Sequence, residues 1–133
     1  GVFLGVTYTD PTYGPTFRQY YPGAVVASDI NAYVMDDPSA LFKVAVVSAT
    51  TTIGYVNRTA VGENAILVQN SGSTITGNSG VAVNATTATT STYPVRIIDV
   101  VPATAIAGYP GSYTEVIVKW IASIHQYTNP TGV

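Results

Sequence analysis

Cysteine is absent from this chain, and charged residues are scarce. Of its 133 residues only 9% are Asp, Glu, Lys or Arg, against roughly 25% in an average soluble domain. The lack of cysteine excludes disulfide bridges and thiolate metal ligands. Thr, Ser, Asn and Gly supply the polarity instead, and such neutral side chains can face either water or another subunit. The shortage of charge therefore favours a subunit of an assembly, with a Thr-rich extracellular β-domain as the alternative.

Basic residues number only five, and they are scattered along the sequence. A nucleic-acid-binding protein needs a stripe of Lys and Arg to neutralise phosphates, and binding to an anionic membrane surface needs a similar cluster. No apolar run approaches the roughly 20 residues of a membrane-spanning helix. We therefore expect neither nucleic acid nor a membrane as partner. The chain begins at Gly1 without a basic signal-peptide region, and we expect this to be a processed or trimmed end.

The residues that could carry chemistry do not form a catalytic set. His125 is the only histidine, and Ser123 close to it is not framed by the G-x-S-x-G motif of a nucleophile. Asp36 and Asp37 are the only adjacent acids, and neighbours on an extended chain point to opposite sides. Since Pro38 follows them, a turn-capping role is the better interpretation. We expect no catalytic residue, no metal site and no cofactor.

The hydrophobic pattern predicts strands and little or no helix. No window keeps a 3.6-residue apolar period, whereas short runs of β-branched and aromatic residues alternate with Gly, Pro, Asn and Asp turns. Residues 65–69 fit a strand or one helical turn, 71–80 a loop, 81–84 a short strand, and 85–92 a loop or an edge strand. The predicted strands are residues 2–9, 16–21, 24–27, 30–35, 41–49, 53–56, 95–101 and 113–121.

Strands of about 5–8 residues with frequent turns are typical of β-sandwiches and β-barrels. We expect residues 1–133 to form one all-β domain, an antiparallel β-sandwich or β-barrel. The last predicted strand alternates well, with the charged Glu115 and Lys119 on a wetter face and Val116 and Val118 on the other.

Candidate contact residues come from the apolar N-terminal segment and from the tyrosines. Residues 2–6 would be an aggregation hazard if left unpaired, so we expect them to pair, either in their own sheet or along a neighbour's edge. The chain has ten tyrosines, whose large apolar rings and polar tips suit interfaces and sugar platforms, although Tyr is also common on half-buried strands. The predicted interface residues are Val2, Phe3, Leu4, Tyr20, Tyr21, Tyr109 and Tyr127.

Seven segments carry turn and strand signatures in a recognisable order. They are GVFLGVTYTD (1–10), QYYP (19–22), AYVMDDP (32–38), VGENA (61–65), TGNS (76–79), VRII (95–98) and YTEVIVK (113–119). Over most of the chain this order resembles the small virion structural proteins of tailed phages, especially marine ones. The resemblance implies a decoration or cement protein on the outer capsid surface, without catalytic residues. It also implies the major capsid protein or further copies of the chain as partners, in a homo-oligomer or a lattice.

A cement protein stabilises a shell because it binds the assembled form and not the disassembled one, and many copies add avidity. The neutral, aromatic, strand-rich sequence fits this function. Two other functions remain open. One is a carbohydrate- or receptor-binding module of a tail or fibre, and the other is a subunit of an extracellular filament that donates residues 2–9 as a strand.

Overall fold

The computed structural model describes residues 1–105 and 113–121. Their regular structure consists of strands β1 to β9 and the short 3-10 helices η1 (Arg58–Ala60) and η2 (Pro102–Thr104). The predicted all-β class is therefore confirmed. The contacts divide the chain into two compact units, which the sequence did not indicate. The sheet unit comprises Gly1–Asp37 and Ser71–Gly80, and the barrel unit comprises Pro38–Asn70 and the described residues after Gly80.

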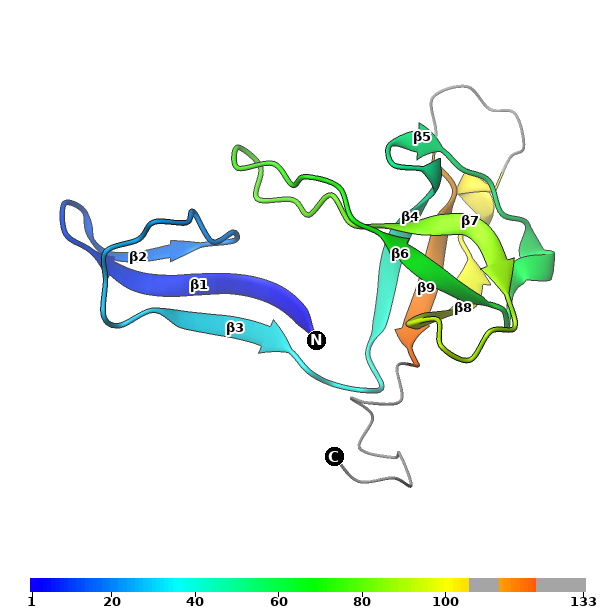
Figure 1. Cartoon of the computed structure of the whole chain (residues 1–133), viewed down its shortest axis with the longest axis horizontal. Helices are drawn as coiled ribbons and strands as arrows, with labels where there is room; N and C mark the ends of the chain where they lie inside the picture. Colours follow the sequence, from blue (N-terminus) through cyan, green and yellow to red (C-terminus); the bar gives the residue numbers. More distant parts are fainter. Residues whose placement is uncertain (106–112, 122–133) are drawn as a thin grey trace. The chain divides into compact units, whose positions relative to one another are not determined.

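The sheet unit contains a three-stranded antiparallel sheet in the order β2-β1-β3 (Figure 1). Its strands are β1 (Val2–Asp10), β2 (Gly14–Arg18) and β3 (Asn31–Met35). The apolar N-terminal segment thus pairs inside its own sheet, with β3 from Val2 onward and with β2 from Val6 onward. This is one of the two arrangements expected from the sequence. The pairing of β1 with β3 shifts register between Phe3 and Gly5, so Leu4 is an extra residue on β1.

A three-residue loop joins β1 to β2, and its sequence explains the turn. Asp10 and Gly14 are opposite one another, and the Asp10 Oδ1 atom accepts hydrogen bonds from the backbone N–H groups of Thr12 (2.8 Å) and Tyr13 (3.1 Å). Gly14 has a φ of +77°, in the left-handed region that glycine adopts without steric cost. This is a common three-residue hairpin connection.

The prediction of a strand over residues 24–27 is wrong, because this segment is irregular. Pro22 has no N–H to donate to a ladder. Gly23 and Ala24 both have positive φ values, 69° and 44°, so the chain turns before a strand can form. The valines at 25 and 26 therefore belong to a loop despite their high β-propensity.

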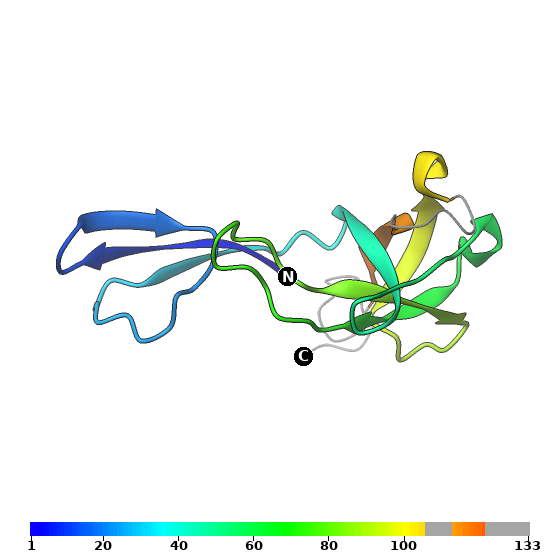
Figure 2. The same ribbon diagram turned by 90° about the horizontal axis from the view of Figure 1, so that it is seen from above.

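The barrel unit contains six strands in the order β5-β4-β7-β6-β8-β9. Antiparallel pairing of β4 with β9, from Leu41↔Lys119 to Ala45↔Glu115, closes β4, β7, β6, β8 and β9 into a five-stranded barrel (Figures 1 and 2). The strands are β4 (Leu41–Ala49), β5 (Thr52–Ile53), β6 (Asn64–Val68), β7 (Ala82–Ala88), β8 (Val95–Val100) and β9 (Glu115–Trp120).

Several strands of this unit differ from the predicted ones in length, type or pairing. The strand predicted at 53–56 is reduced to β5, and the ambiguous segment 65–69 is the strand β6 rather than a helical turn. In the Thr/Ala-rich segment 85–92, the residues up to Ala88 belong to β7, which lies between β4 and β6 instead of at an edge, and the residues after Ala88 form a loop. The β4–β7 pair is parallel, through Val46↔Val83, so the barrel is not antiparallel throughout.

Small aliphatic side chains fill the barrel, because an enclosure of only five strands is narrow. The predicted alternation along the last strand is confirmed: Val116 and Val118 are buried, whereas Glu115 and Lys119 are partly exposed. The buried core consists of Val46, Val56, Ala60, Ala65, Val83, Val95, Ile97, Val100, Val116 and Val118.

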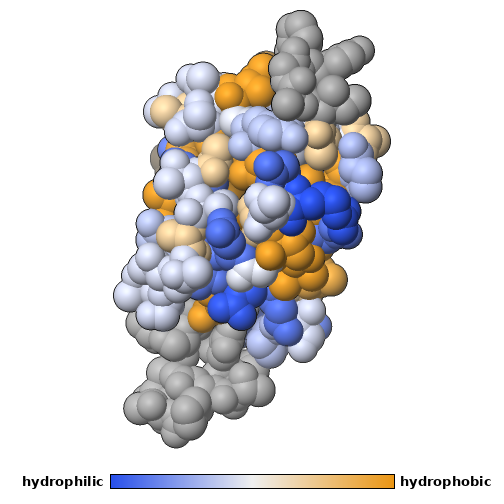
Figure 3. All heavy atoms as spheres, turned by 90° about the vertical axis from the view of Figure 1, so that its right-hand side faces the viewer, coloured by the Kyte–Doolittle hydropathy of each residue, from blue (hydrophilic) through white to orange (hydrophobic). Residues whose placement is uncertain are grey.

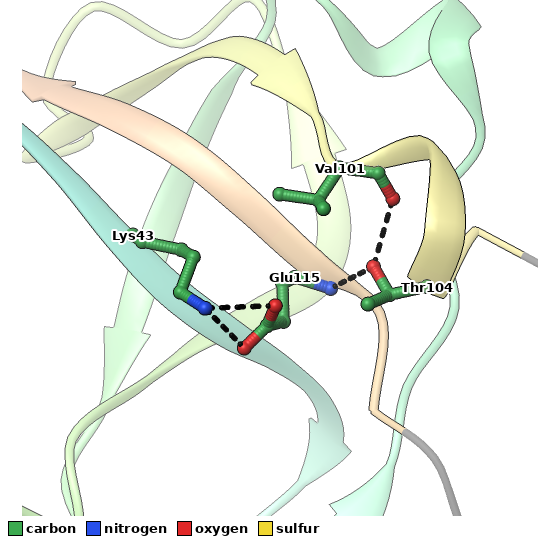
Figure 4. A network of polar contacts seen from close by, with 4 residues as sticks. All are labelled: Lys43, Val101, Thr104 and Glu115. Atoms are coloured by element: carbon green, nitrogen blue, oxygen red, sulfur yellow. Dashed lines mark hydrogen bonds and ion pairs between the residues drawn. The ribbon is translucent and has the colours of Figure 1, made fainter.

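A polar network fastens β9 to η2 and to β4 (Figure 4). The Glu115 backbone N–H donates to Thr104 Oγ1 (2.8 Å), and the same hydroxyl donates to the Val101 carbonyl (2.9 Å). On the outer side of the strand, Lys43 Nζ lies 3.0 Å from Glu115 Oε1 and 3.0 Å from Oε2.

The two halves of this network should contribute unequally to stability. Thr104→Val keeps the shape of the side chain but leaves a partly buried backbone N–H without its acceptor, so we expect a loss of about 1–3 kcal/mol in the free energy of unfolding. Lys43→Met removes an exposed ion pair and should cost less than about 1 kcal/mol. Urea denaturation of both variants tests this order, and a larger loss for Lys43→Met would contradict it.

Gly54 marks a close approach of two backbones. A Cβ at this position would lie 2.5 Å from the Val47 carbonyl carbon and 2.7 Å from the Ser48 nitrogen. The Gly54 N–H also donates to the Val46 carbonyl at 3.2 Å. Gly54→Ala must push β5 away from β4, and we expect it to destabilise the barrel by about 1–3 kcal/mol. The exposed Ser48→Ala is the control, and equal thermal stability of the two variants would refute the close approach.

Candidate interaction surface

One face of the three-stranded sheet carries exposed aromatic and sulfur-containing side chains. Phe17 is opposite Thr7 on β1, and Tyr33 is opposite Gly5. A Cβ at Gly5 would lie 2.6 Å from Phe17 Cζ, so the Phe17 ring covers this glycine. Met35 lies two residues beyond Tyr33 and so shares its face. We call Phe17, Tyr33 and Met35 the aromatic face; they are 59%, 50% and 39% exposed.

The opposite face of the same sheet is covered over β1, whereas Val34 of β3 on the same face is exposed. Val6 and Tyr8 alternate with Gly5 and Thr7 along β1 and are only 1% and 4% exposed. The segment between β2 and β3 lies on one side of the strands in Figure 2, and Arg18 Nε donates a hydrogen bond to the Tyr8 hydroxyl (3.0 Å) on this side. The sheet unit therefore has one face with its own small core and one face whose large side chains are open.

The two edges of the sheet differ in their protection. An edge strand presents unpaired backbone N–H and C=O groups, and proteins block such edges with charges, proline or bulges. The outer edge of β2 carries Pro15 and Arg18. All five residues of β3, Asn31–Met35, are exposed, and none is charged or proline. Within residues 1–105 and 113–121, no strand pairs with the outer edge of β3, so this edge is open to a partner strand.

Asp29 holds the chain against β1 just before β3 begins. Its Oδ1 accepts from the Thr9 backbone N–H (3.0 Å), and its Oδ2 accepts from the Thr9 hydroxyl (2.6 Å). Both bonds lower the pKa of the Asp29 carboxyl, and the bond from the Thr9 hydroxyl is the larger cause. The Asp29 carbonyl also accepts from Asn31 Nδ2 (3.0 Å). Asp29 therefore positions the start of the open edge strand.

The interface residues predicted from the sequence fall in two places within the sheet unit. Val2, Phe3 and Leu4 lie at the start of β1, where Phe3 and Leu4 are exposed. Tyr20 and Tyr21 lie just after β2, and Tyr20 is half-buried. Tyr109 and Tyr127 are outside the described residues.

The aromatic face was not predicted, although two of its residues lie in the strand predicted at 30–35. Phe17, Tyr33 and Met35 each alternate with smaller or polar neighbours on their strands. This alternation, with a period of two residues, is the sequence pattern that indicates a shared face. It does not reveal which face is covered, because that depends on the side of the sheet over which the connecting segment 19–30 folds.

The residues considered for chemistry are not brought together. Asp36 and Asp37 directly follow β3, in an irregular segment, while His125 and Ser123 are outside the described residues. Across residues 1–105 and 113–121, no group of three or more His, Cys, Asp or Glu side chains could hold a metal ion. Over the same residues, no helix is long and apolar enough to cross a membrane.

The barrel unit also has exposed apolar side chains, but they are dispersed. On the face seen in Figure 3, apolar residues form separate patches between hydrophilic ones. Exposed apolar residues of this unit include Leu41, Tyr55, Ile66 and Ile98, which come from different elements. Scattered apolar residues are normal on a soluble surface, so the sheet unit is the better candidate for a contact surface.

The hydrogen bonds to Asp29 should make the stability of the protein depend on pH. Because the folded-state pKa is below the ordinary value, the contribution of these bonds to stability is present above the unfolded-state pKa and is lost as pH falls through the folded-state pKa. Thr9→Val removes the hydroxyl donor and should raise the pKa of Asp29 toward its ordinary value. An NMR titration of the Asp29 carboxyl carbon measures this change, and an identical pKa in both proteins would refute the assigned cause.

Comparisons with known proteins identify no relative of this chain. No protein-family model matches it, and no curated protein or solved structure is significantly similar.

Proposed function

We propose that this protein is a non-enzymatic assembly protein of a virion, of the capsid decoration or cement type, that binds the shell through the sheet unit. The observation that supports this most is the open β3 edge next to the aromatic face. The proposed partner is the major capsid protein, the virion surface is the proposed location, and the chain acts by binding rather than by chemistry.

Strand addition is the mode of contact that the β3 edge suits. A partner strand would take up the free backbone groups of β3, and alternate side chains would set specificity. Tyr33 and Met35 would then lie next to side chains of the added strand on the aromatic face. Backbone pairing supplies hydrogen bonds, and burial of the Phe17, Tyr33 and Met35 side chains supplies the hydrophobic contribution.

The charges around β3 favour a different protein over a second copy in this contact. Asp29 precedes the strand, and Asp36 and Asp37 follow it. If two copies paired antiparallel with Tyr33 opposite Tyr33, Asp29 of each copy would oppose Asp37 of the other. Like charges directly opposite one another are destabilising. A capsid strand flanked by basic residues would be attracted by the same acids.

Such a contact need not be strong to be effective. A shell presents many equivalent sites, and each bound copy shifts the equilibrium toward the assembled shell. The low charge of the chain reduces the cost of placing many copies side by side, because neighbouring copies repel one another only weakly.

A charge on the β3 edge should abolish assembly without unfolding the protein. Val34 is exposed on β3, and Val34→Lys puts the usual edge-blocking residue there. We expect the variant to keep its melting temperature, since exposed substitutions change stability by about 0.5 kcal/mol or less. We expect it to lose at least tenfold in co-sedimentation with virions of the phage that encodes the chain.

Ile66→Lys is the matched control, because Ile66 is an exposed aliphatic residue on β6 of the barrel unit. It should co-sediment like the unmodified protein. Equal binding of Val34→Lys and the unmodified protein would overturn the role of β3. Failure of the unmodified protein to bind virions at all would overturn the proposed function.

A further inference from the structure

A groove lies on the covered side of the sheet unit, away from the aromatic face. It has a volume of about 410 Å³, within the range of roughly 300–1,000 Å³ found for small-molecule sites. Tyr8 and Arg18 line it from the strands β1 and β2. Pro11 lines it from the hairpin turn, and Tyr20 and Pro22 line it from the segment after β2.

Arg18 is held in this groove by two tyrosines. Its Nε donates to the Tyr8 hydroxyl at 3.0 Å, and its Nη1 donates to the Tyr20 hydroxyl at 3.3 Å. The guanidinium carbon lies 5.8 Å from the centre of the Tyr20 ring, within cation–π range. The hydrogen bond to Tyr8 is the main cause that raises the pKa of Arg18. The side chain is thus a fixed, permanent cation.

The cation has no anionic partner within the described part of the chain. The ion pairs there are Lys43–Glu115 and Arg58–Asp99, and neither involves Arg18. A guanidinium has five N–H donors, and these two bonds use only the Nε donor and one on Nη1. The other Nη1 hydrogen and both Nη2 hydrogens remain available for a planar, bidentate acceptor.

The groups next to Arg18 are also donors. The Tyr8 and Tyr20 oxygens accept from Arg18, so each hydroxyl keeps its own hydrogen to donate. Asp10, the acidic residue of the groove, uses Oδ1 to accept from the turn's N–H groups. The groups around Arg18 are therefore mainly donors, which favours a ligand with acceptor oxygens, and a carboxylate can in addition pair with the cation.

We propose that this groove binds a carboxylate-bearing sugar of the uronic-acid class, with the carboxylate on Arg18 and the sugar ring against Tyr20 and the neighbouring prolines. A carboxylate matches the fork of the guanidinium, and a ring with an apolar side and a polar rim suits Tyr and Pro surfaces. A polyanion such as nucleic acid would need several cations in a row, and Arg18 is the only basic residue among those lining the groove. This site is separate from the β3 edge, so it does not depend on the proposed assembly function.

The test is an NMR titration of the isotope-labelled full chain with sodium D-glucuronate. We expect saturable shifts of the Arg18 Nε–H and of the Tyr20 backbone amide. D-glucose, which lacks the carboxylate, and acetate, which lacks the ring, should each bind at least tenfold more weakly. Arg18→Lys and Tyr20→Ala should each weaken glucuronate binding by at least tenfold. Arg58→Lys, whose arginine is paired with Asp99 in the barrel unit, should not change it.

Other results would overturn the proposal. Equal binding of glucose would remove the role of the carboxylate, and equal binding of acetate or inorganic phosphate would reduce the groove to a general anion site. Unchanged affinity in Arg18→Lys would exclude this residue. Tyr20→Phe keeps the ring if a larger change disturbs folding, but it removes the hydroxyl that holds Arg18. Its affinity for glucuronate should therefore lie between those of the unmodified protein and Tyr20→Ala, and affinity equal to that of the unmodified protein would exclude a role for the hydroxyl. Val34→Lys should bind glucuronate normally, which separates this proposal from the assembly function.

Discussion

Backbone hydrogen bonding is the constraint on which the rest of the structure depends. Each strand must pair along both sides or leave groups that only water or a partner can satisfy. In the barrel unit, the antiparallel pairing of β4 with β9 solves this by closing five strands on themselves. In the sheet unit only β1 is paired on both sides. The sheet unit therefore has unpaired backbone groups on the outer sides of β2 and β3. The two edges differ in protection, because β2 carries Pro15 and Arg18 whereas β3 carries neither a charged residue nor a proline.

The sequence predicted the all-β class and most of the strands, because these depend on local patterns. The alternation of residues 113–121 correctly placed Val116 and Val118 inside. Residues 24–27 show the limit of propensity: positive φ at Gly23 and Ala24 overrides the valines that follow. Residues 85–88 show another limit, because their Thr and Ala pattern predicted a loop or an edge strand, whereas they belong to β7, which lies between β4 and β6. The aromatic face and the Arg18 groove depend on which side of the sheet the loop covers, and single-sequence patterns do not contain that information.

The few charged residues have distinct surroundings. Lys43 pairs with Glu115 across β4 and β9, and Arg58 pairs with Asp99. Asp29 accepts two hydrogen bonds from Thr9 and so fixes the start of β3. Arg18 differs from these because its partners are the hydroxyls of Tyr8 and Tyr20. The sheet unit thus combines an open edge and aromatic face on one side with a donor-lined groove on the other, while the barrel unit supplies a closed core.

Amide hydrogen exchange of β3 tests the central claim most directly. In an edge strand, alternate N–H groups point away from the sheet and exchange readily with solvent. We predict that the outward-pointing amides of Asn31–Met35 exchange fast in the isolated protein and become protected when it is bound to virions, while the amides of the barrel core stay protected in both states. Fast exchange of these β3 amides in the virion-bound protein would contradict the account.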